Sequence, residues 1–468
     1  MTQQGKQGKR PSASRPLGAR DIALDTLRRV ETDQAYSNLQ LNRALQEAQL
    51  SRADAGLATE LVYGTIQRQG TLDYWLGKFV AKGLDKLEPW VRQLLRMSVY
   101  QLVYLDRIPP HAAVNEAVQI AKRRGHAGIA GMVNGVLRNM LRRRNELVIP
   151  EGLAPADRMV LEYSHPKWLV ERWIRAYGEE TTEAMCASDN EPPHASIRVN
   201  RLRATREELL ARLREQELSA SPSELAPQGI VVERGGNLAD TPSFRDGLWT
   251  VQDESSMLVA EAADPQPGMQ VLDCCAAPGG KTTHLAEKMN DEGRVFANDL
   301  HPHKLKLIEE QAERLGLSCI RTMSGDAGEL AEHFAPGSMD VVLLDAPCSG
   351  LGVIRRKPEL KWNKTPKDIA AIANIQHRLL GSCSKLVRPG GVLVYSTCTV
   401  ERKENEEQVE RFLQDYSEFE LDTQWPEAVL ASLKAKGAIG DDFGGMVQLL
   451  PHQAGSDGFF IARLRRRG

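Results

Sequence analysis

Residues 271–285 read VLDCCAAPGGKTTHL, and this stretch decides the fold of the second half of the chain. Its first three residues form an apolar run that ends in Asp273, which is typical of a buried parallel strand. The small residues 276–280 predict a tight turn, and we expect a helix from Lys281 onward. A strand, a glycine turn and a helix N-terminus together predict a site where the backbone approaches a nucleotide-like ligand closely.

The composition is that of an ordinary globular protein. The chain has 468 residues, of which 41% are hydrophobic and 26% are charged, and at roughly 150 residues per domain this length predicts about three domains. No apolar run is long enough to span a bilayer, and residues 1–16 lack the apolar core of a signal peptide. We therefore expect a disordered basic tail at residues 1–16 of a cytoplasmic protein. The seven cysteines show no disulfide spacing, which predicts reduced thiols.

Residues 17–145 are expected to form an all-α domain. Apolar residues recur there at helical spacing, most clearly in one stripe made of Val133, Val136, Leu137, Met140 and Leu141. Residues 121–144 contain seven Lys or Arg and no acid. Such a run fits either a solvated helix face or contact with RNA phosphates, and both alternatives stay open.

The helical region resembles the NusB-like RNA-binding domain. The resemblance lies in ARDIALDTLRRV (residues 19–30), LVYG (61–64), HAAVNEAVQIAK (111–122) and NGVLRNML (134–141). It covers about the first 145 residues and implies an RNA-binding role for this part of the chain.

Two smaller segments follow. Residues 146–187 read as a helical connector. Residues 188–251 predict a small α+β module, RRM-like but without evident RRM aromatic motifs. Its strands are expected at residues 195–200, 230–232 and 248–251. Its helix, at residues 205–216, begins with Thr205 and Glu208 in the spacing of a capping box.

Residues 252–468 alternate between strands and helices. Apolar runs predict strands at 271–272, 295–297, 341–344 and 392–395, with a late strand at 459–464 at the far end of the sheet. Helical patterns occupy 284–288, 303–314, 369–386 and 405–413. This alternation predicts an α/β domain with a mostly parallel sheet and helices on both faces.

Acids recur where these strands end and after a further strand expected at residues 320–323. A single aspartate often serves only as a helix cap or turn residue. Four of them at one sheet edge beside a glycine turn predict a nucleoside pocket. Asp299 follows the turn by about twenty residues, where an acid accepts hydrogen bonds from ribose hydroxyls. The four acids are Asp273, Asp299, Asp326 and Asp345.

A phosphate-binding loop is the competing interpretation of the turn. Gly280-Lys281-Thr282 matches the end of such a loop, but the loop needs a glycine where Cys275 stands. Pro278 also removes one backbone donor that a phosphate cradle would use. The sequence therefore disfavours an ATPase.

Two cysteines stand directly after apolar strands. Cys348 lies in DAPCSG and Cys398 in YSTCT, at strand ends where active-site groups are exposed. A thiolate is a strong nucleophile when nearby positive charge lowers its pKa. Carbon 6 of a pyrimidine ring is a suitable electrophile, and spacing alone does not rank the two thiols. Buried packing is the expected role of Cys186, Cys319 and Cys383.

The second half of the chain resembles the S-adenosylmethionine-dependent RNA 5-methylcytosine methyltransferases of the RsmB type, also called the Sun or Fmu type. With the NusB-like region, the resemblance spans nearly the whole chain. It implies a class I Rossmann-like methyltransferase domain at residues 252–468. Its motifs are VLDCCAAPGGKTTHL, NDLHPHKL (298–305), GDA (325–327), DAPCSGLGVIRRKPELKW (345–362), YSTCTVERKENE (395–406) and SDGFFIARL (456–464).

This resemblance implies roles for individual residues. Cys398 would attack carbon 6 of cytosine, and Cys348 would assist breakdown of the covalent adduct. Asp345 would lie between cofactor and base, with Lys281 beside it. Asp299 would hold the ribose hydroxyls. Asp326 would hold the adenine edge, while the rest of S-adenosylmethionine would be wrapped by Cys275, Ala276, Ala277, Pro278, Gly279, Gly280 and Lys281.

The implied reaction is methylation of carbon 5 of one cytosine, of the cytosine-967 type, in 16S ribosomal RNA. The substrate would be the RNA or an early small-subunit assembly intermediate, and the target base must be unstacked. No metal is expected, because the ten histidines show no ligand spacing. The sequence leaves the oligomeric state open, and we expect a monomer without membrane attachment. The rival hypotheses are a non-catalytic RNA-binding or assembly protein and a P-loop ATPase.

A basic run lies between the two cysteines, and we expect it to contact the RNA backbone. Glu359 is the one acid that opposes this run, which consists of Arg355, Arg356, Lys357, Lys361, Lys364 and Lys367.

Overall fold

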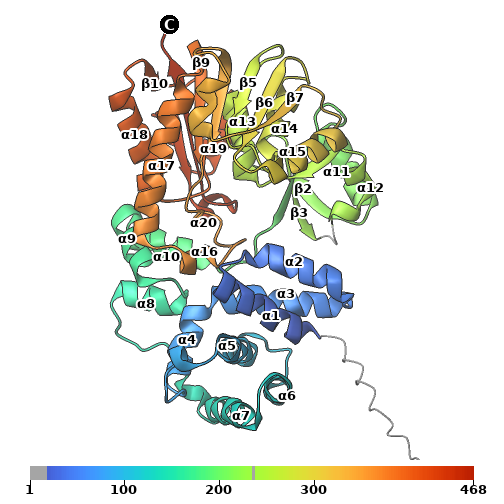
Figure 1. Cartoon of the computed structure of the whole chain (residues 1–468), viewed down its shortest axis with the longest axis vertical. Coiled ribbons are helices and arrows are strands. Elements are labelled where there is room, and N and C mark those ends of the chain that lie inside the picture. Colours follow the sequence, from blue (N-terminus) through green and yellow to red (C-terminus); the bar gives the residue numbers. More distant parts are fainter. Residues whose placement is uncertain (1–17, 235–237) are drawn as a thin grey trace, which may run out of the picture. The chain divides into compact units, whose positions relative to one another are not determined.

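The computed structural model describes residues 18–234 and 238–468, so the basic tail predicted at residues 1–16 lies outside the described part. The chain divides into two compact units, one ending at Lys167 and one beginning at Trp168. Each unit is described by itself (Figure 1). The boundaries proposed for the smaller segments remain predictions.

The first unit is all-α, as predicted. The apolar stripe of the seventh helix explains its packing: Val133, Val136, Leu137 and Met140 are all buried, since residues three and four apart share one helix face. Prolines stand at the first turn of three of the helices, α5, α6 and α8, where the backbone N–H would have no partner within the helix. The elements are α1 (Ala19–Asp33), α2 (Ser37–Ala48), α3 (Arg52–Gln67), α4 (Gln69–Gly77), η1 (Leu84–Lys86), α5 (Pro89–Tyr104), α6 (Pro110–Arg124), α7 (Ala127–Arg142), η2 (Arg144–Glu146) and α8 (Pro155–Glu162).

Part of the basic run at residues 121–144 stabilises this unit. Arg123 and Arg124 form ion pairs with acids of α1, namely Asp21 and Asp25. Another member of the run, Arg143, pairs with Glu146 three residues along the chain. These three arginines therefore have structural partners, which the sequence did not reveal.

The second unit opens with helices α9 (Lys167–Tyr177) and α10 (Glu179–Ser188), followed by a small antiparallel sheet of order β2-β3-β1-β4. The capping box of Thr205 and Glu208 is present at the start of α11. The strand β2 was not predicted, because its sequence SASP has no apolar alternation. The elements are β1 (Ala195–Val199), α11 (Arg206–Glu215), β2 (Ser219–Pro222), β3 (Gly229–Arg234), η3 (Leu238–Asp240), α12 (Pro242–Arg245) and β4 (Trp249–Val251).

The larger sheet has the order β10-β12-β9-β8-β5-β6-β7, and β11 also pairs with β12. The five strands from β5 to β9 run parallel to their neighbours, as predicted, and β12 is antiparallel to β9. The late strand was placed wrongly at the far end of the sheet, because β10 lies outside it. The strands are β5 (Gln270–Asp273), β6 (Arg294–Asp299), β7 (Ile320–Ser324), β8 (Met339–Asp345), β9 (Val387–Thr397), β10 (Phe419–Leu421), β11 (Met446–Leu449) and β12 (Phe459–Arg466).

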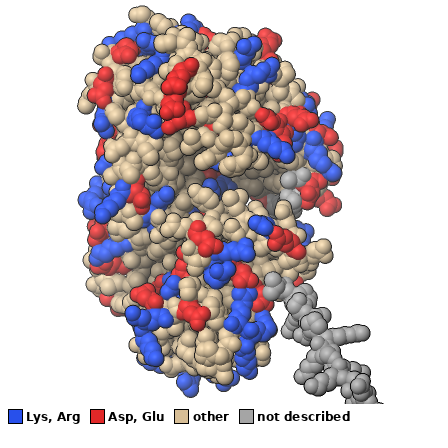
Figure 2. Space-filling view, viewed as in Figure 1, with Lys and Arg blue, Asp and Glu red and all other residues tan. Residues whose placement is uncertain are grey.

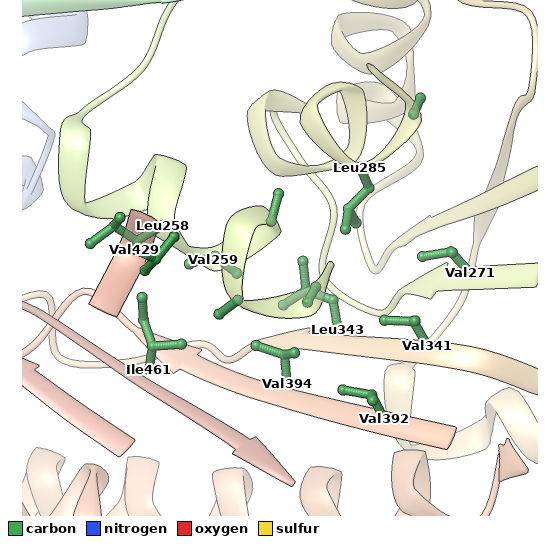
Figure 3. Close-up of a cluster of buried hydrophobic side chains, with 14 of the residues drawn as sticks. Leu258, Val259, Val271, Leu285, Val341, Leu343, Val392, Val394, Val429 and Ile461 are labelled. Carbon is green, nitrogen blue, oxygen red and sulfur yellow. The ribbon is translucent and has the colours of Figure 1, made fainter. Parts of the chain in front are cut away.

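Helices cover both faces of this sheet because successive strand residues point in opposite directions. In β8, Val341 and Leu343 pack under α13, α14, α15 and α19 (Figure 3), while Val342 and Leu344 pack under α17, α18 and η4. The elements between and after the strands are α13 (Glu254–Ala263), α14 (Gly280–Lys288), α15 (Pro302–Leu315), η4 (Ala327–Glu332), α16 (Leu360–Asn363), α17 (Pro366–Ser384), η5 (Arg402–Glu404), α18 (Glu406–Asp415), α19 (Glu427–Ala435) and α20 (Pro451–Ala454).

Within residues 18–234 and 238–468, none of the helices combines the length and apolarity needed to cross a membrane.

Candidate active site

The site lies where the order of the parallel strands reverses. From β5 the chain proceeds through β6 to β7 on one side, and then returns to β8 and β9 on the other side. Ligands of open α/β sheets bind at such a switch point, beyond the carboxyl ends of the strands. Asp273 and Asp345 end the two strands that flank this point.

A cavity of about 260 Å³ opens at this position. It brings together most of the predicted cofactor turn with Lys281, Asp345 and Cys398. It also includes residues that the sequence did not single out, from β4, α13 and the start of β12. Its lining consists of Val251, Gln252, Asp253, Ser255, Ser256, Asp273, Cys275, Ala276, Ala277, Pro278, Gly280, Lys281, Asp345, Val353, Cys398, Asp457 and Phe459.

The glycine turn needs its glycine. Gly279 has a φ of 105°, a left-handed conformation that side chains other than glycine rarely adopt. A Cβ atom there would also lie 3.1 Å from the Cα of Ile308. The turn is tied to the end of β6, because the Ala277 N–H donates to Asp299 Oδ2 at 3.3 Å. Asp299 therefore lies against the turn, although it does not line the cavity, and its role at the ribose hydroxyls remains a prediction.

Asp326 lies apart from this cavity. Its carboxylate caps η4 by accepting the Gly328 N–H at 2.8 Å, and Arg378 approaches it at 3.5 Å. It does not line the cavity. The contacts of Asp326 are those of a helix cap, and its role at an adenine edge remains a prediction.

Lys281 and Asp345 form an ion pair inside the cavity. The Lys281 ammonium donates to Asp345 Oδ2 at 2.7 Å, and the Ser396 hydroxyl donates to Asp345 Oδ1 at 2.8 Å. The ammonium also lies 5.1 Å from the centre of the Phe459 ring, where a cation is attracted to the ring face. Burial lowers the pKa of Lys281, but the Asp345 carboxylate raises it above its ordinary value. Lys281 is therefore a fixed positive charge.

The two predicted thiols meet at the edge of the cavity. The Sγ atoms of Cys348 and Cys398 are 3.3 Å apart. Hydrogen bonds join the loops that carry them: the Gly352 N–H donates to the Cys398 carbonyl at 3.0 Å. The hydroxyls of Ser349 and Thr399 are 2.7 Å apart. The close approach of the thiols therefore follows from the packing of two loops.

The surroundings distinguish the two thiols. A hydrogen bond from Cys348 lowers the pKa of the Cys398 thiol, and the ammonium groups of Lys281 and Lys357 lower it further against the effects of burial and Asp345. The same hydrogen bond, together with burial, raises the pKa of the Cys348 thiol. The arrangement therefore favours a Cys398 thiolate that accepts a hydrogen bond from the Cys348 thiol.

Asp273 is a buried acid at the bottom of this site. Burial is the main cause that raises its pKa to about 7, and the charge of Asp345 adds to the shift. The Thr282 hydroxyl donates to Oδ2 at 2.7 Å, whereas Oδ1 has no hydrogen-bond partner in the described structure. A cavity that combines this orphaned oxygen with Asp345 and a glycine turn fits a ligand that carries positive charge and hydrogen-bond donors, as S-adenosylmethionine does.

Three members of the basic run between the cysteines have structural positions, so the predicted RNA contact was wrong for these three. It stays a prediction for Lys357, Lys364 and Lys367. Arg355 donates to the Gly455 carbonyl at 2.6 Å. Arg356 pairs with Asp253 and Asp457, both at 2.8 Å. Lys361 is fully buried. The partners of Arg355 and Arg356 are distant in sequence. A count of charges along a short stretch of the chain therefore does not reveal them.

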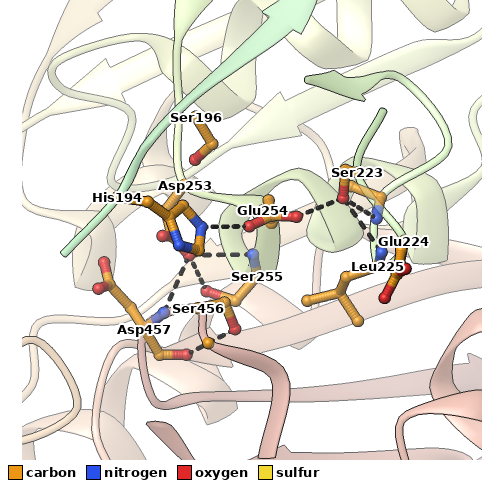
Figure 4. A network of polar contacts seen from close by, with 12 residues as sticks. His194, Ser196, Ser223, Glu224, Leu225, Asp253, Glu254, Ser255, Ser456 and Asp457 are labelled. Atoms are coloured by element: carbon orange, nitrogen blue, oxygen red, sulfur yellow. Dashed lines mark hydrogen bonds and ion pairs between the residues drawn. The ribbon is translucent and has the colours of Figure 1, made fainter. Parts of the chain in front are cut away.

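Both acids that pair with Arg356 line the cavity. Asp253 also caps α13 by accepting the Ser255 N–H at 3.0 Å, and it accepts the Asp457 N–H at 3.3 Å. Figure 4 shows the contacts of Asp253 with Ser255 and Asp457 and, beside them, the contact of Glu254 with His194. The Asp253 and Ser255 spacing at the start of a helix was a signal that could have identified this cap.

Arg198 links the small sheet to the cofactor turn. This fully buried side chain of β1 donates to the Gly280 carbonyl at 2.6 Å and to Thr283 Oγ1 at 3.0 Å. It pairs with Glu287 at 2.7 Å, which is also fully buried, and it donates to the Gln252 side chain. Nothing local in the sequence distinguishes Arg198, because its partners lie 54 to 89 residues away.

In the described ranges, 18–234 and 238–468, no group of three or more His, Cys, Asp or Glu side chains is arranged to hold a metal ion.

Three family models match the chain. The model described as 16S rRNA methyltransferase RsmB/F matches residues 260–465. The NusB family model matches residues 17–142. A ferredoxin-like domain of the RsmF/B-like methyltransferases matches residues 165–239, which gives the fold of the small α+β module. The helical, ferredoxin-like and Rossmann-like parts are thus those expected from the sequence.

Individual proteins agree with these models. The chain is 46% identical over 456 residues to a Bacillus subtilis (strain 168) protein named probable ribosomal RNA small subunit methyltransferase B, covering 96% of this chain and 99% of the relative. It is 35% identical to ribosomal RNA small subunit methyltransferase B of Yersinia enterocolitica, covering 96% and 98%. The solved structure of NSun6 from Pyrococcus horikoshii with SFG has a TM-score of 0.57 and 26% identity, covering 65% of this chain and 98% of that one. The chain therefore belongs to the ribosomal RNA small subunit methyltransferase B family.

Proposed function

We propose that this protein methylates carbon 5 of one cytosine, of the cytosine-967 type, in 16S ribosomal RNA, with S-adenosylmethionine as cofactor and a covalent bond between Cys398 and carbon 6. The observation that carries the proposal is the meeting of two unequal thiols at 3.3 Å beside the Lys281–Asp345 pair. Family membership supports the methyltransferase activity on small-subunit ribosomal RNA and removes support for a P-loop ATPase.

The cofactor would be held by the turn and by the acids around it. Asp299, which contacts the turn at Ala277, would hold the ribose hydroxyls, and Asp326 the adenine edge. Asp345 would lie between cofactor and base. Bound there, S-adenosylmethionine would supply an electrophilic methyl group to carbon 5. The remaining cofactor contacts are assigned to residues 275–281.

The first task of the protein groups is to make carbon 5 nucleophilic. The Cys398 thiolate forms a bond to carbon 6, and the electron pair of the C5–C6 double bond moves into the ring. The Asp345 carboxylate, which we assign to the base edge, would accept a hydrogen bond from the protonated ring nitrogen and so favour the form of the ring that is electrophilic at carbon 6. Lys281 stabilises the thiolate before the attack.

The second task is to release the product. After methylation, a water molecule acting as base takes the proton from carbon 5, the C–H electron pair forms the C5–C6 double bond again, and the electron pair of the S–C6 bond returns to Cys398. The Cys348 thiol supports this step because its hydrogen bond stabilises the departing thiolate. The two thiols therefore have different tasks in the proposed reaction. Cys398 forms and breaks the bond to carbon 6, and Cys348 donates a hydrogen bond to the Cys398 sulfur.

The target base must leave its stack to reach this cavity, so an unpaired or partly folded region of the RNA is the substrate expected. The substrate would be 16S ribosomal RNA or an early small-subunit assembly intermediate, and we expect a monomer that works in the cytoplasm. The NusB-like helices would bind RNA while the second unit carries out the chemistry.

Methyl transfer from radiolabelled S-adenosylmethionine to unmodified 16S transcripts tests the proposal. We expect label in 5-methylcytosine at one position, found by bisulfite sequencing, and none with a Cys398→Ala variant. Label in another base, or at carbon 5 of several unrelated cytosines, would contradict it. Tight binding of the same transcript without methyl transfer would instead support an RNA-binding or assembly protein.

A further inference from the structure

A groove between α6 and α7 of the helical unit has no role in the reaction described above. Its volume is about 580 Å³, within the range of sites that hold small ligands. We call it the α6–α7 groove. Its lining is formed by Pro110, His111, Val114, Asn115, Arg138, Leu141 and Arg142.

The rim of the α6–α7 groove is basic. Arg138 and Arg142 stand four residues apart on α7, on the same helix face, and His111 stands at the start of α6. All three side chains are exposed, and no acid is among the described residues that line the groove. Figure 2 shows Lys and Arg side chains around the end of this unit that carries α6 and α7.

Among the described residues, some arginines of the basic run at residues 121–144 form ion pairs within the helical unit, and others do not. Arg123, Arg124 and Arg143 all have acidic partners within the unit. Arg142 forms no ion pair with any residue in the described ranges, and Arg138 bonds only the side-chain oxygen of Asn134, at 2.9 Å. The positive charge without acidic partners therefore includes the two arginines that face the groove.

The floor of the α6–α7 groove has a different chemistry. Val114 is buried, Leu141 is half-buried, and both present aliphatic surface to the groove. Asn115 adds an exposed amide, which both donates and accepts hydrogen bonds. An apolar floor, one amide and a basic rim match the three parts of a nucleotide: the base faces, the base edge and the phosphate.

We propose that the α6–α7 groove binds one unpaired nucleotide of a single-stranded RNA segment, with the base over Val114 and Leu141 and the flanking phosphates at Arg138 and Arg142. Asn115 bonds the edge of the base. The inference rests on the proposed function in one respect, namely that the substrate is RNA. A duplex cannot use this site, because its bases are stacked and paired.

Fluorescence anisotropy of the full-length protein with a labelled single-stranded RNA of about 12 nucleotides tests this site. Arg142→Ala and Arg143→Ala form a matched pair, since they remove the same charge from neighbouring positions, one in the groove and one paired with Glu146. We expect Arg142→Ala to raise the Kd about five- to tenfold and Arg143→Ala less than twofold. The Arg138→Ala/Arg142→Ala variant should also lower the salt slope by about two.

Photocrosslinking with the same RNA carrying 4-thiouridine locates the base. The inference requires crosslinked peptides from residues 110–115 or 138–142, and weaker crosslinking in Asn115→Ala. Equal loss of affinity in Arg142→Ala and Arg143→Ala, or crosslinks outside both segments, would overturn the groove while leaving RNA binding intact. Equal weakening of single-stranded and hairpin RNA by Arg142→Ala would also overturn it. Failure of the parent protein to bind any RNA would remove the proposed function as well.

Discussion

The Sγ atoms of Cys348 and Cys398 lie 3.3 Å apart although 50 residues separate them along the chain. Their environments differ, because Lys281 and Lys357 lower the pKa of the Cys398 thiol whereas the hydrogen bond to Cys398, together with burial, raises that of Cys348. One of them is therefore suited to attack and the other to donate a hydrogen bond. This asymmetry leads directly to the first two predictions.

Substitution of the two thiols should give opposite results. Cys398→Ala should abolish methyl transfer, because no other thiol faces the cavity with a lowered pKa among the described residues. Cys348→Ala should accumulate a covalent protein–RNA adduct, seen as a slower band in denaturing gels. Accumulation of the adduct in Cys398→Ala instead would reverse the order of the thiols.

Lys281 should control the reactivity of Cys398. Lys281→Met removes a positive charge that lowers the pKa of the thiol, so the pH midpoint for alkylation of Cys398 should move upward. Iodoacetamide labelling between about pH 6 and 10, followed by mass spectrometry of the Cys398 peptide, measures this midpoint. Lys304→Met, which removes a partner of Asp299, is the matched control. An unchanged midpoint in Lys281→Met would contradict the role of Lys281.

Asp273 should make stability depend on pH. Its folded-state pKa is raised from 3.8 to about 7, mainly by burial, so the folded state binds the proton more tightly than the unfolded state. The stabilisation from this proton is complete below about pH 4 and is lost as the pH rises through 7. Three units of pKa correspond to about 4 kcal/mol.

The variant Asp273→Asn keeps the shape of the protonated acid without the ionisation. Differential scanning fluorimetry without cofactor measures the Tm of both proteins. The Tm of Asp273→Asn should rise relative to that of the parent as the pH rises from 5 to about 8. The control variant is Asp442→Asn, at an exposed position. The difference between its Tm and that of the parent should be the same at each pH. A constant difference between Asp273→Asn and the parent would show that Asp273 is ionised in the folded protein throughout.

Arg198 should affect both stability and cofactor affinity, by separate routes. Arg198→Met leaves Glu287 as an unpaired charge in a fully buried site, which should lower the free energy of unfolding by about 3–5 kcal/mol. Arg198→Met/Glu287→Met removes both charges and should recover most of that loss. It should still bind S-adenosylmethionine more weakly, because the Gly280 carbonyl loses its hydrogen bond from Arg198.

Isothermal titration calorimetry of the double variant separates these two effects. Parent-like affinity in a stably folded Arg198→Met/Glu287→Met protein would limit Arg198 to a structural role. Reduced affinity at unchanged Tm would establish it as a positioning residue for the turn.

Most strands and helices were predictable because their signals are local. The alternation in Val341–Leu344 and the stripe on α7 arise from residues a few positions apart, and tertiary packing agrees with them. The missed strand β2 has no such signal, since SASP is polar and ends in proline. It forms because β3 supplies the hydrogen-bond partners.

The candidate site was predictable to the extent that its residues lie in continuous motifs. Most of the turn, Lys281, Asp345 and Cys398 line one cavity and Cys348 contacts Cys398, while the roles assigned to these residues remain predictions. The expected RNA contact of Arg355 and Arg356 was wrong, because their partners, Gly455, Asp253 and Asp457, lie about 100 residues away. A count of charges along the chain takes account only of residues that are close in sequence.

By itself, the amino-acid sequence determined the strand–turn–helix around the glycines, the order of helical and α/β segments, and the family motifs, since all of these depend on residues close together in the chain. Only the tertiary structure decided that the two thiols meet in surroundings that shift their pKa values in opposite directions, which basic side chains have acidic partners, and that Arg198 reaches the Gly280 carbonyl. These outcomes depend on electrostatic and hydrogen-bonded contacts between segments 50 or more residues apart, and such contacts exist only after the segments pack.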